Sequence, residues 1–327
     1  MDVRAPAEFQ QGHIPGAGNL PIFNNEERAQ VGTTYKQQGH DAAVSLGFDI
    51  TGPKWSGFIE QARGLVPGKK LAIHCWRGGM RSAAMAWALD FSGFDVYVLE
   101  GGYKSYRNWA LEQFAKTYPL QLVGGMTGSG KTTLLQELEK KGEQVIDLED
   151  LAQHKGSTYG TMNRLVQPTQ EQFENNLALQ LARYSTGKRI WMEDESSMIG
   201  KCLIPRPLWK QMRDASLVNI TIPFEQRVHA LVAEYGCLDK DFLVACTERI
   251  CKRLGPEQTQ QAVAAIREDR MSDFVKQVLR YYDKTYTTGL QSRNAKSILT
   301  VDLTGMNAAQ HAIQVLDVIS QHEYDRN

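Results

Sequence analysis

The chain has 327 residues, and at roughly 100–200 residues per domain this length predicts two domains. No apolar run approaches the ~18 residues of a membrane span, and the first residues, MDVRAPAEFQ, lack a signal pattern, so we expect a cytoplasmic protein without a membrane partner. Its 37 basic and 37 acidic side chains leave no net charge, which excludes a whole-protein basic field and leaves RNA binding to a local basic face.

The first part of the chain alternates short strands and helices. Strands are predicted at residues 71–75 and 94–102, where short apolar runs are bounded by a Pro-Gly-Lys-Lys stretch and by a double glycine. Helices are predicted at residues 80–93, ending at Gly93, and at residues 103–118, ended by Pro119. We place the first domain at residues 1–118.

The second part, residues 119–327, begins a new alternation. Strands are predicted at residues 120–125, 143–148, 189–193, 217–222 and 297–303, and helices at residues 131–142, 171–185 and 224–235. Alternation of this kind predicts a mostly parallel sheet covered on both faces, so the fold class is α/β. Residues 239–290 show no strand pattern and predict a helical insertion. There we interpret Tyr281, Tyr282 and Tyr286 as a packed aromatic face in preference to a base-stacking platform.

A phosphate-binding loop is predicted at GMTGSGKT, residues 125–132, which fits G-x-x-x-x-G-K-[ST] between a strand and a helix. Glycines let backbone N–H groups turn toward a phosphate, and the helix N-terminus adds partial positive charge. Lys131 would reach the terminal phosphate oxygens. The loop does not distinguish nucleotides, diphosphate esters and small phosphoryl compounds. The predicted phosphate-binding residues are Gly125, Thr127, Gly128, Ser129, Gly130, Lys131 and Thr132.

Acidic residues follow two other predicted strands. Asp194 is the best candidate for a metal-linked carboxylate, with Glu193 next; Glu195 completes that acidic run. Asp147 and Glu149 follow another strand, on the ligand-facing edge of such a sheet, and their role stays open. We predict no tightly bound metal, and Mg²⁺ would be held by Thr132 and Asp194 if it binds. The competing interpretation is a solvated acidic turn.

A reactive thiol is predicted in HCWRGGMRS, residues 74–82. Cys75 ends a strand, Gly78 and Gly79 allow N–H groups to point at the sulfur, and Arg77 and Arg81 add charge. Each feature favours thiolate, so we predict these five residues as the catalytic set. A buried, inert cysteine is the alternative, but an arginine-flanked glycine loop makes a poor apolar core.

The remaining cysteines are expected to be inert. Five cysteines is an odd number, and no C-x-x-C pair occurs, which favours free thiols in a reducing compartment and argues against a structural zinc site. The four outside the loop are Cys202, Cys237, Cys246 and Cys251.

Two chemistries use such a thiolate. In one, Cys75 attacks a phosphate ester while Arg81 clamps its oxygens, as the H-C-x5-R-S signature of cysteine-dependent phosphatases suggests. In the other, the thiolate takes up sulfur or selenium and passes it on. The loop alone does not decide between them.

Longer stretches carry a family resemblance. DVRAPAEFQQGHIPGAGNLP, residues 2–21, resembles the opening signature of rhodanese domains, over residues 1–118. The strand that leads into this signature is nearly absent, so we expect missing native N-terminal residues and a weakened sheet edge. Nearly the whole chain resembles the tRNA 2-selenouridine synthase family, through six blocks in the same order: CWRGGMRS, EGGYKSYR, GGMTGSGKT, DLEDLAQHKGSTYG, EDESSMIG and PFEQRVHALVAEY. Asp150 and Lys155 depart from the family pattern.

This resemblance implies a reaction. Its substrate would be tRNA with 2-thiouridine at the wobble position, selenium would come from selenophosphate, and geranyl diphosphate would supply an S-geranyl intermediate. The phosphate loop would suit the diphosphate leaving group, and Cys75 would carry selenium as a selenosulfide beside Arg77 and Arg81. Selenophosphate synthetase is a candidate partner, and a monomer is favoured.

Two basic clusters are candidates for tRNA contact. The first holds Lys201, Arg206, Lys210 and Arg213, and the second holds Arg249, Lys252 and Arg253. Solvated helix faces are the competing interpretation of both clusters.

Two other function classes stay open. One is a cysteine-dependent phosphatase or sulfurtransferase fused to a nucleotide-binding module; as a phosphatase it needs a general-acid carboxylate near Cys75 that the sequence does not identify. The other is a non-catalytic, nucleotide-switched RNA-binding module, which the intact cysteine loop argues against.

Overall fold

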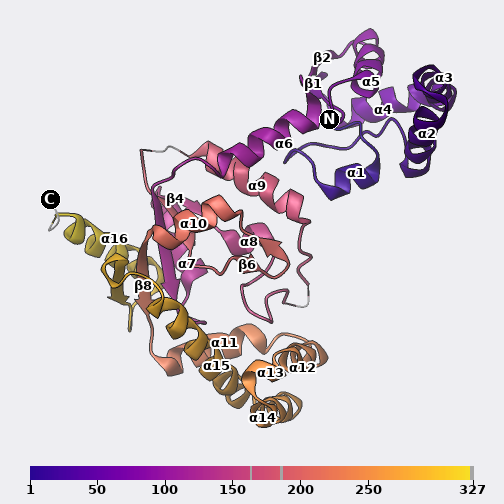
Figure 1. Cartoon of the computed structure of the whole chain (residues 1–327). Coiled ribbons are helices and arrows are strands. Elements are labelled where there is room, and N and C mark those ends of the chain that lie inside the picture. Colours follow the sequence, from indigo (N-terminus) through magenta and orange to yellow (C-terminus); the bar gives the residue numbers. More distant parts are fainter. Residues whose placement is uncertain (163, 185–186, 325–327) are drawn as a thin grey trace. The chain divides into compact units, whose positions relative to one another are not determined.

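The structure, a computed structural model, describes residues 1–162, 164–184 and 187–324 (Figure 1). Two compact units make up the chain. Unit 1 holds Met1–Gln113 together with Glu174–Leu179, and unit 2 holds Phe114–Phe173 together with the chain from Gln180 onward. The predicted division after residue 118 stays a prediction.

Unit 1 surrounds a small parallel sheet. Strand β1 pairs with β2 so that Leu71 lies opposite Val96, and Asp2 forms isolated parallel bridges to His74 and Asn19. The N-terminal edge expected to be weak is therefore paired at Asp2. The elements are α1 (Pro6–Gln11), α2 (Asn25–Gln38), α3 (His40–Thr51), η1 (Gly52–Lys54), α4 (Trp55–Leu65), β1 (Lys70–Ile73), α5 (Met80–Phe91), β2 (Asp95–Val98) and α6 (Gly102–Gln113).

Helix α6 ends five residues before the predicted position, because a side chain replaces its backbone hydrogen bonds. Gln211 of α10 (Arg206–Asp214) accepts from the Tyr118 N–H at 3.1 Å and donates to the Lys116 carbonyl at 2.8 Å. Phe114 and Tyr118 are buried. Pro119, which the sequence suggested as the stop, lies beyond this irregular stretch.

Unit 2 is built on a five-stranded sheet with the order β4-β5-β3-β8-β9, in which every pairing is parallel. Its strands are β3 (Leu120–Gly125), β4 (Gln144–Ile146), β5 (Ile190–Glu193), β8 (Ser216–Thr221) and β9 (Ile298–Asp302). All four residues of β5 are buried, as parallel sheets covered on both faces require. The predicted α/β class with a parallel sheet is confirmed.

Helices and a short hairpin complete this unit. The elements are α7 (Lys131–Lys140), α8 (Leu148–Ala152), α9 (Gln170–Arg183), β6 (Met198–Ile199), β7 (Cys202–Leu203), α10, α11 (Phe224–Tyr235), η2 (Ala295–Ser297) and α16 (Ala308–Tyr324). Helix α9 was predicted to reach Ser185, which lies outside the described residues. Val123, Leu134, Trp191 and Val315 share one core beneath α7 and α16.

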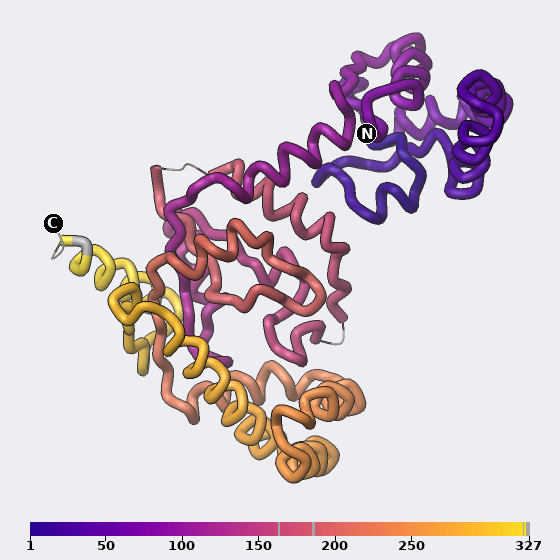
Figure 2. The backbone as a smooth tube through the Cα atoms, in the orientation of Figure 1, coloured from indigo at the N-terminus to yellow at the C-terminus, as the bar shows by residue number. Residues whose placement is uncertain are grey.

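The predicted helical insertion is present. Residues 239–290, all of which are described, contain helices and no strand. They form α12 (Lys240–Arg249), α13 (Cys251–Leu254), α14 (Pro256–Arg267) and α15 (Met271–Gln291), and α15 runs beside α11 in Figure 2. Apolar side chains of α11, α12, α14 and α15 form a core. Tyr282 packs against it, and the Tyr282 hydroxyl accepts from the Thr158 N–H. Among the described residues, no helix is long and apolar enough to cross a membrane.

Candidate active sites

The first site is the connection between β1 and α5, where Cys75 lies. Its Sγ accepts a hydrogen bond from Ser82 Oγ at 3.3 Å, and the residue is 4% exposed. Burial by itself raises the pKa of the Cys75 thiol, but the Ser82 side chain, the backbone at Ser82 and Arg77, and the Arg81 charge together outweigh it, so that the pKa is lowered. The geometry therefore favours a thiolate.

The two arginines of the predicted set occupy different places. Arg81 Nη1 donates to Glu8 Oε2 at 2.8 Å, and Arg28 Nε lies 3.6 Å from the same oxygen. Arg77 is exposed and acts on the sulfur through its backbone. The structure thus holds Cys75, Gly79 and Arg81 around one turn, while the Arg77 side chain is exposed.

A second glycine turn supports the cysteine loop. The Tyr103 N–H donates to the Cys75 carbonyl, and the Lys104 N–H donates to the Trp76 carbonyl, both at 2.9 Å. Gly102 has φ +59°, and a Cβ there would lie 2.4 Å from the Gly78 nitrogen and 2.5 Å from the Cys75 oxygen. The sequence indicates a strand end at this double glycine and includes it in the EGGYKSYR block, but it does not predict the contact between this turn and the cysteine loop.

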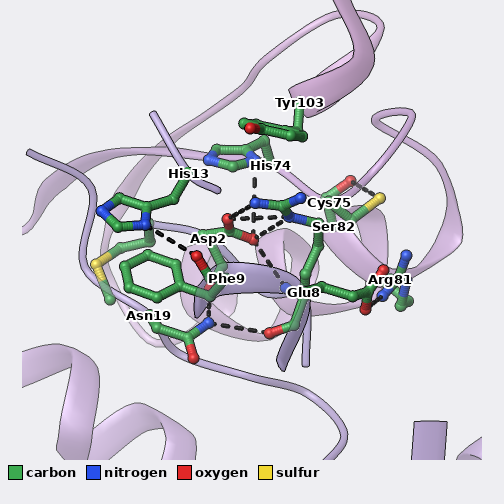
Figure 3. A network of polar contacts seen from close by, with 12 residues as sticks. Asp2, Glu8, Phe9, His13, Asn19, His74, Cys75, Arg81, Ser82 and Tyr103 are labelled. Carbon is green, nitrogen blue, oxygen red and sulfur yellow. Dashed lines mark hydrogen bonds and ion pairs between the residues drawn. The ribbon is translucent and has the colours of Figure 1, made fainter. Parts of the chain in front are cut away.

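Buried polar groups lie behind the loop (Figure 3). Arg4 makes a bidentate ion pair with the fully buried Asp2, and its guanidinium lies 3.7 Å from the centre of the Tyr103 ring. His74 stacks on Tyr103, and burial lowers the pKa of His74 despite the nearby Asp2 charge. The network anchors the residue that precedes Cys75 and keeps a neutral imidazole there.

The second site is the predicted phosphate loop, between β3 and α7. Gly128 and Gly130 have φ of +80° and +81°, as a tightly curled loop requires. A Cβ on Gly125 would lie 2.5 Å from Ser129 Oγ. Lys131 Nζ donates to the Gly125 carbonyl at 3.1 Å, so the lysine lies across the loop where phosphate oxygens would be bound.

Two carboxyl groups border this loop. Thr132 Oγ1 lies 3.4 Å from Glu149 Oε2, and a Cβ on Gly156 would lie 2.6 Å from Glu149 and 3.2 Å from both oxygens of Glu195. Burial and the Glu149 charge raise the pKa of Glu195 to about 7, with Lys131 opposing. Burial also raises the pKa of Glu149. The strand order explains why Glu149 and Glu195 lie beside the phosphate loop. Because β4, β5 and β3 are neighbours in a parallel sheet, the segments that follow them lie at the same edge.

The three acidic residues chosen from sequence each have a different partner. Asp194 Oδ1 accepts from Arg293 Nη2 at 2.5 Å, and the Glu193 side chain is fully buried and accepts from the Leu148 N–H at 2.9 Å. Burial raises the pKa of Glu193 well above its usual value. Asp147 caps α8 by accepting from the Asp150 N–H, and it lines a cavity of about 370 Å³ with Thr132 and Glu149.

A Mg²⁺ site fits the oxygen donors beside Thr132. Mg²⁺ is commonly bound by one or two carboxylates together with substrate phosphates and water. The Glu149 carboxylate lies within hydrogen-bond distance of Thr132, whereas Asp194 is engaged by Arg293. The part of the chain that the structure describes contains no group of three or more His, Cys, Asp or Glu arranged to hold a metal. A metal role for Thr132 and Asp194 stays a prediction.

The helical insertion is linked to the phosphate loop through Arg227 of α11. Arg227 of α11 is 3% exposed; its Nη1 donates to the Thr127 carbonyl at 3.1 Å. The same guanidinium makes two hydrogen bonds to Asp283 of α15, at 2.8 and 2.7 Å. Sequence reasoning did not single out this pair, since its members lie 56 residues apart.

The predicted basic clusters occupy surface elements. Arg206, Lys210 and Arg213 lie on α10 with Lys201 in the β6–β7 turn, and the second cluster lies on α12 and α13. Arg213 donates to Ser292 Oγ at 2.9 Å. Their contact with tRNA stays a prediction.

Comparison with known proteins places both sites in known families. The family described as "tRNA 2-selenouridine synthase AAA domain" matches residues 118–314, and the rhodanese-like domain family matches residues 1–108. A protein of Shewanella denitrificans named "tRNA 2-selenouridine synthase" is 33% identical, over 94% of this chain and 92% of the relative. One of Nitrosomonas eutropha with the same name is 40% identical over 72% of this chain and 62% of the relative. This chain thus spans about three fifths of the latter protein.

One solved structure is also similar. It is an N-terminal domain from Clostridium difficile 630, 44% identical over 34% of this chain and 86% of that domain, with a TM-score of 0.33.

Proposed function

This chain belongs to the tRNA 2-selenouridine synthase family, and from that premise we propose that it replaces the sulfur of wobble 2-thiouridine in tRNA by selenium. Selenophosphate is the selenium donor. The observation that carries the proposal is a single chain in which a thiol of lowered pKa and a phosphate loop are both formed. A non-catalytic, nucleotide-switched RNA-binding module would need only the second of these sites.

The phosphate loop serves an alkylation step in this proposal. The sulfur of 2-thiouridine attacks C1 of geranyl diphosphate, the C1–O bond breaks, diphosphate leaves with its electron pair, and the base loses its N3 proton. Lys131 and the loop N–H groups stabilise the charge that develops on the diphosphate. Mg²⁺, if bound beside Thr132 and Glu149, would neutralise part of the same charge.

Cys75 serves the exchange step. A selenosulfide on Cys75 would need a two-electron oxidant, because selenium in selenophosphate is already at the selenide level. The Cys75 thiolate instead attacks the phosphorus of selenophosphate, the P–Se bond breaks and selenide leaves with its electron pair, while the Arg77 and Arg81 charges attract the anionic donor. Selenide adds to C2 of the S-geranylated base, and the C2–S bond breaks so that geranyl thiolate leaves with the electron pair. Water then hydrolyses the S-phosphocysteine, which releases phosphate and restores the thiolate.

Finer features belong to the same proposal. The clusters on α10 and on α12–α13 would contact the tRNA backbone, a monomer would be the working form, and selenophosphate synthetase would deliver the donor. Reversal of charge at Lys210 or Arg253 should weaken tRNA binding in filter assays. The affinity of the phosphate loop for its small ligand should not change.

Nucleoside mass spectrometry on 2-thiouridine tRNA tests the proposal. The intact chain, Cys75→Ala and Lys131→Ala are each incubated with geranyl diphosphate, selenophosphate and a thiol. We expect 2-selenouridine from the intact chain, accumulation of the geranylated base with Cys75→Ala, and neither product with Lys131→Ala.

Supplying pre-geranylated tRNA separates the two sites. Lys131→Ala should convert it to 2-selenouridine, whereas Cys75→Ala should not. Failure of Lys131→Ala to convert it, with geranylation intact, would reverse the assignment of ligands to sites. Absence of any modified base from the intact chain would remove the RNA assignment, and hydrolysis of an aryl phosphate would become the next assay.

A further inference from the structure

Unit 1 contains a cavity of about 840 Å³ that no step above uses. It lies between α2, α3 and the first turn of α5, and its volume falls in the range of small-molecule sites. Most of the side chains around it are apolar, including Phe23, Val31, Ala43, Val44, Phe48 and Met80.

The surrounding helices leave this apolar lining uncovered. None of the residues of α2, all of which the structure describes, is buried, and within residues 40–51 only Ala43 and Thr51 are buried. Phe48 is 61% exposed and Met80 is 56% exposed, although both line the cavity. A hairpin whose apolar side faces a hollow is suited to an apolar ligand.

Basic side chains also line the cavity. Arg28 and Lys36 of α2, His40 of α3 and Arg81 of α5 all border the cavity. Arg28 and Arg81 both approach Glu8, so two guanidinium groups lie together at one part of the lining. An apolar hollow with a cationic border fits a hydrocarbon chain attached to an anionic head or polymer.

The cavity and Cys75 share one turn of helix. Met80, Arg81, Ala83 and Ala84 line the cavity, whereas Ser82, between them, donates to Cys75 Sγ. A hydrocarbon chain bound on one side of this turn would bring the atom to which it is attached close to the Cys75 sulfur on the other side.

We propose that this cavity binds the isoprenoid chain of the S-alkylated base and thereby presents C2 of that base to Cys75. The inference rests on the proposed function, because it takes the geranylated base as the intermediate. Free geranyl diphosphate carries the same chain, so the experiment separates these two sources.

Calorimetric titration of the full chain tests the cavity directly. The probes are S-geranyl-2-thiouridine nucleoside, its S-dimethylallyl analogue and geranyl diphosphate. Each buried methylene contributes about fourfold to affinity, so the analogue, which is five carbons shorter, should bind on the order of 1,000-fold more weakly. Geranyl diphosphate is titrated into the Lys131→Ala variant, in which the phosphate loop is disabled. Any binding that remains measures the affinity of the cavity for geranyl diphosphate.

Matched variants test whether the geranylated nucleoside binds in the cavity. Ala29→Trp fills the cavity from α2, and Gln30→Trp adds the same side chain on the same helix at an exposed position that does not line it. Thr33→Trp fills the cavity independently should Ala29→Trp fail to fold. Filled variants should bind the geranylated nucleoside at least tenfold more weakly, with loss of the negative heat-capacity change of apolar burial, and Gln30→Trp should bind as the parent does.

Equal affinity in the filled variants and Gln30→Trp would overturn the cavity assignment. So would equal rates of conversion of pre-geranylated tRNA, with the intact chain active. Binding of geranyl diphosphate but not of the nucleoside would identify the donor as occupant and overturn the assignment to the base. If the intact chain binds the nucleoside but does not convert geranylated tRNA, the proposed function fails, and the assignment of the cavity to this intermediate fails with it. Loss of conversion in the filled variants only, with the intact chain active, supports the assignment of the cavity.

Discussion

Hydrogen bonding to Cys75 matters at the scale of single residues, because burial alone would make its thiol unreactive. The hydrogen bond from the Ser82 hydroxyl is the main interaction that lowers the pKa of Cys75 against the effect of burial. The same helix turn supplies Ser82 to the sulfur and Arg81 to Glu8, so a single short segment both activates the thiol and positions charge near it.

Ser82→Ala should raise the pKa of Cys75. Loss of a donor to the thiolate favours the thiol, so alkylation of Cys75 by iodoacetamide should slow about tenfold at neutral pH. The rate should recover at high pH, where Cys75 is ionised in both the parent protein and the variant. Peptide mass spectrometry of Cys75 gives the rate at each pH. Ser92→Ala, which changes a serine at the far end of α5, should leave the profile unchanged. An unchanged profile in Ser82→Ala would contradict the assignment.

Glu195 should make diphosphate binding pH-dependent. Its pKa is raised to about 7, so it is protonated below that pH and carries a negative charge above it. In metal-free buffer, pyrophosphate affinity should therefore fall by about tenfold as pH rises through 7, relative to Glu195→Gln. Comparison of the two proteins cancels the titration of pyrophosphate itself. Parallel pH profiles would show that Glu195 does not face the ligand.

Glycine turns act at the scale of elements, where the β2–α6 connection closes on the β1–α5 connection. Both Gly78 and Gly102 have positive φ and lie with their backbones in contact, which leaves no room for a side chain. The two turns therefore hold each other in place.

Gly102→Ala should distort the cysteine loop. The positive φ costs an alanine about 1 kcal/mol, and the Cβ would also overlap Gly78 and Cys75 backbone atoms. Gly93→Ala is the matched control, because φ is +86° there but no atom lies within 4 Å of the added Cβ. Urea unfolding and Cys75 alkylation should both be more affected at Gly102. Similar losses in the two variants would assign the effect to backbone strain alone.

The Arg227–Asp283 pair is the corresponding link in unit 2, joining α11, α15 and the phosphate loop. Asp283→Ala leaves a buried guanidinium unpaired and should lower the free energy of unfolding by about 3 kcal/mol. The double variant Arg227→Met/Asp283→Leu should regain much of that stability but bind pyrophosphate weakly, because Thr127 loses its donor. Urea unfolding and calorimetry measure the two effects. An Asp283→Ala protein as stable as the parent would contradict this account.

Separate cores organise the whole molecule. Ile73, Met85 and Leu89 belong to the core of unit 1, whereas Val123, Leu134 and Val218 belong to that of unit 2. A ligand that binds one folded unit stabilises that unit by mass action.

Pyrophosphate should therefore protect unit 2 selectively. At 100 times its dissociation constant, a single-site ligand adds about 2.7 kcal/mol to the unit that binds it. Hydrogen exchange should slow at Leu122 and Val218 and stay unchanged at Ile73 and Leu89. Lys131→Ala should abolish the protection, and equal protection of both units would show that the cores are coupled.

Several features followed from the sequence by itself. The α/β class, the positions of β3, β5 and β8, the helical insertion, the phosphate loop and the cysteine loop all depend on local patterns: alternation of strand and helix, glycine spacing, and charge beside a thiol. Local physics within a few residues suffices to specify them.

Tertiary structure alone decided the rest, because it brings distant residues together. Strand order put Glu149 and Glu195, rather than Asp194, beside Lys131, and no local pattern encodes strand order. Gln211 ended α6 before Pro119 by replacing its backbone hydrogen bonds. The cavity beside α5 exists only because α2 and α3 pack around a hollow, an outcome that amphipathic spacing in either helix does not reveal.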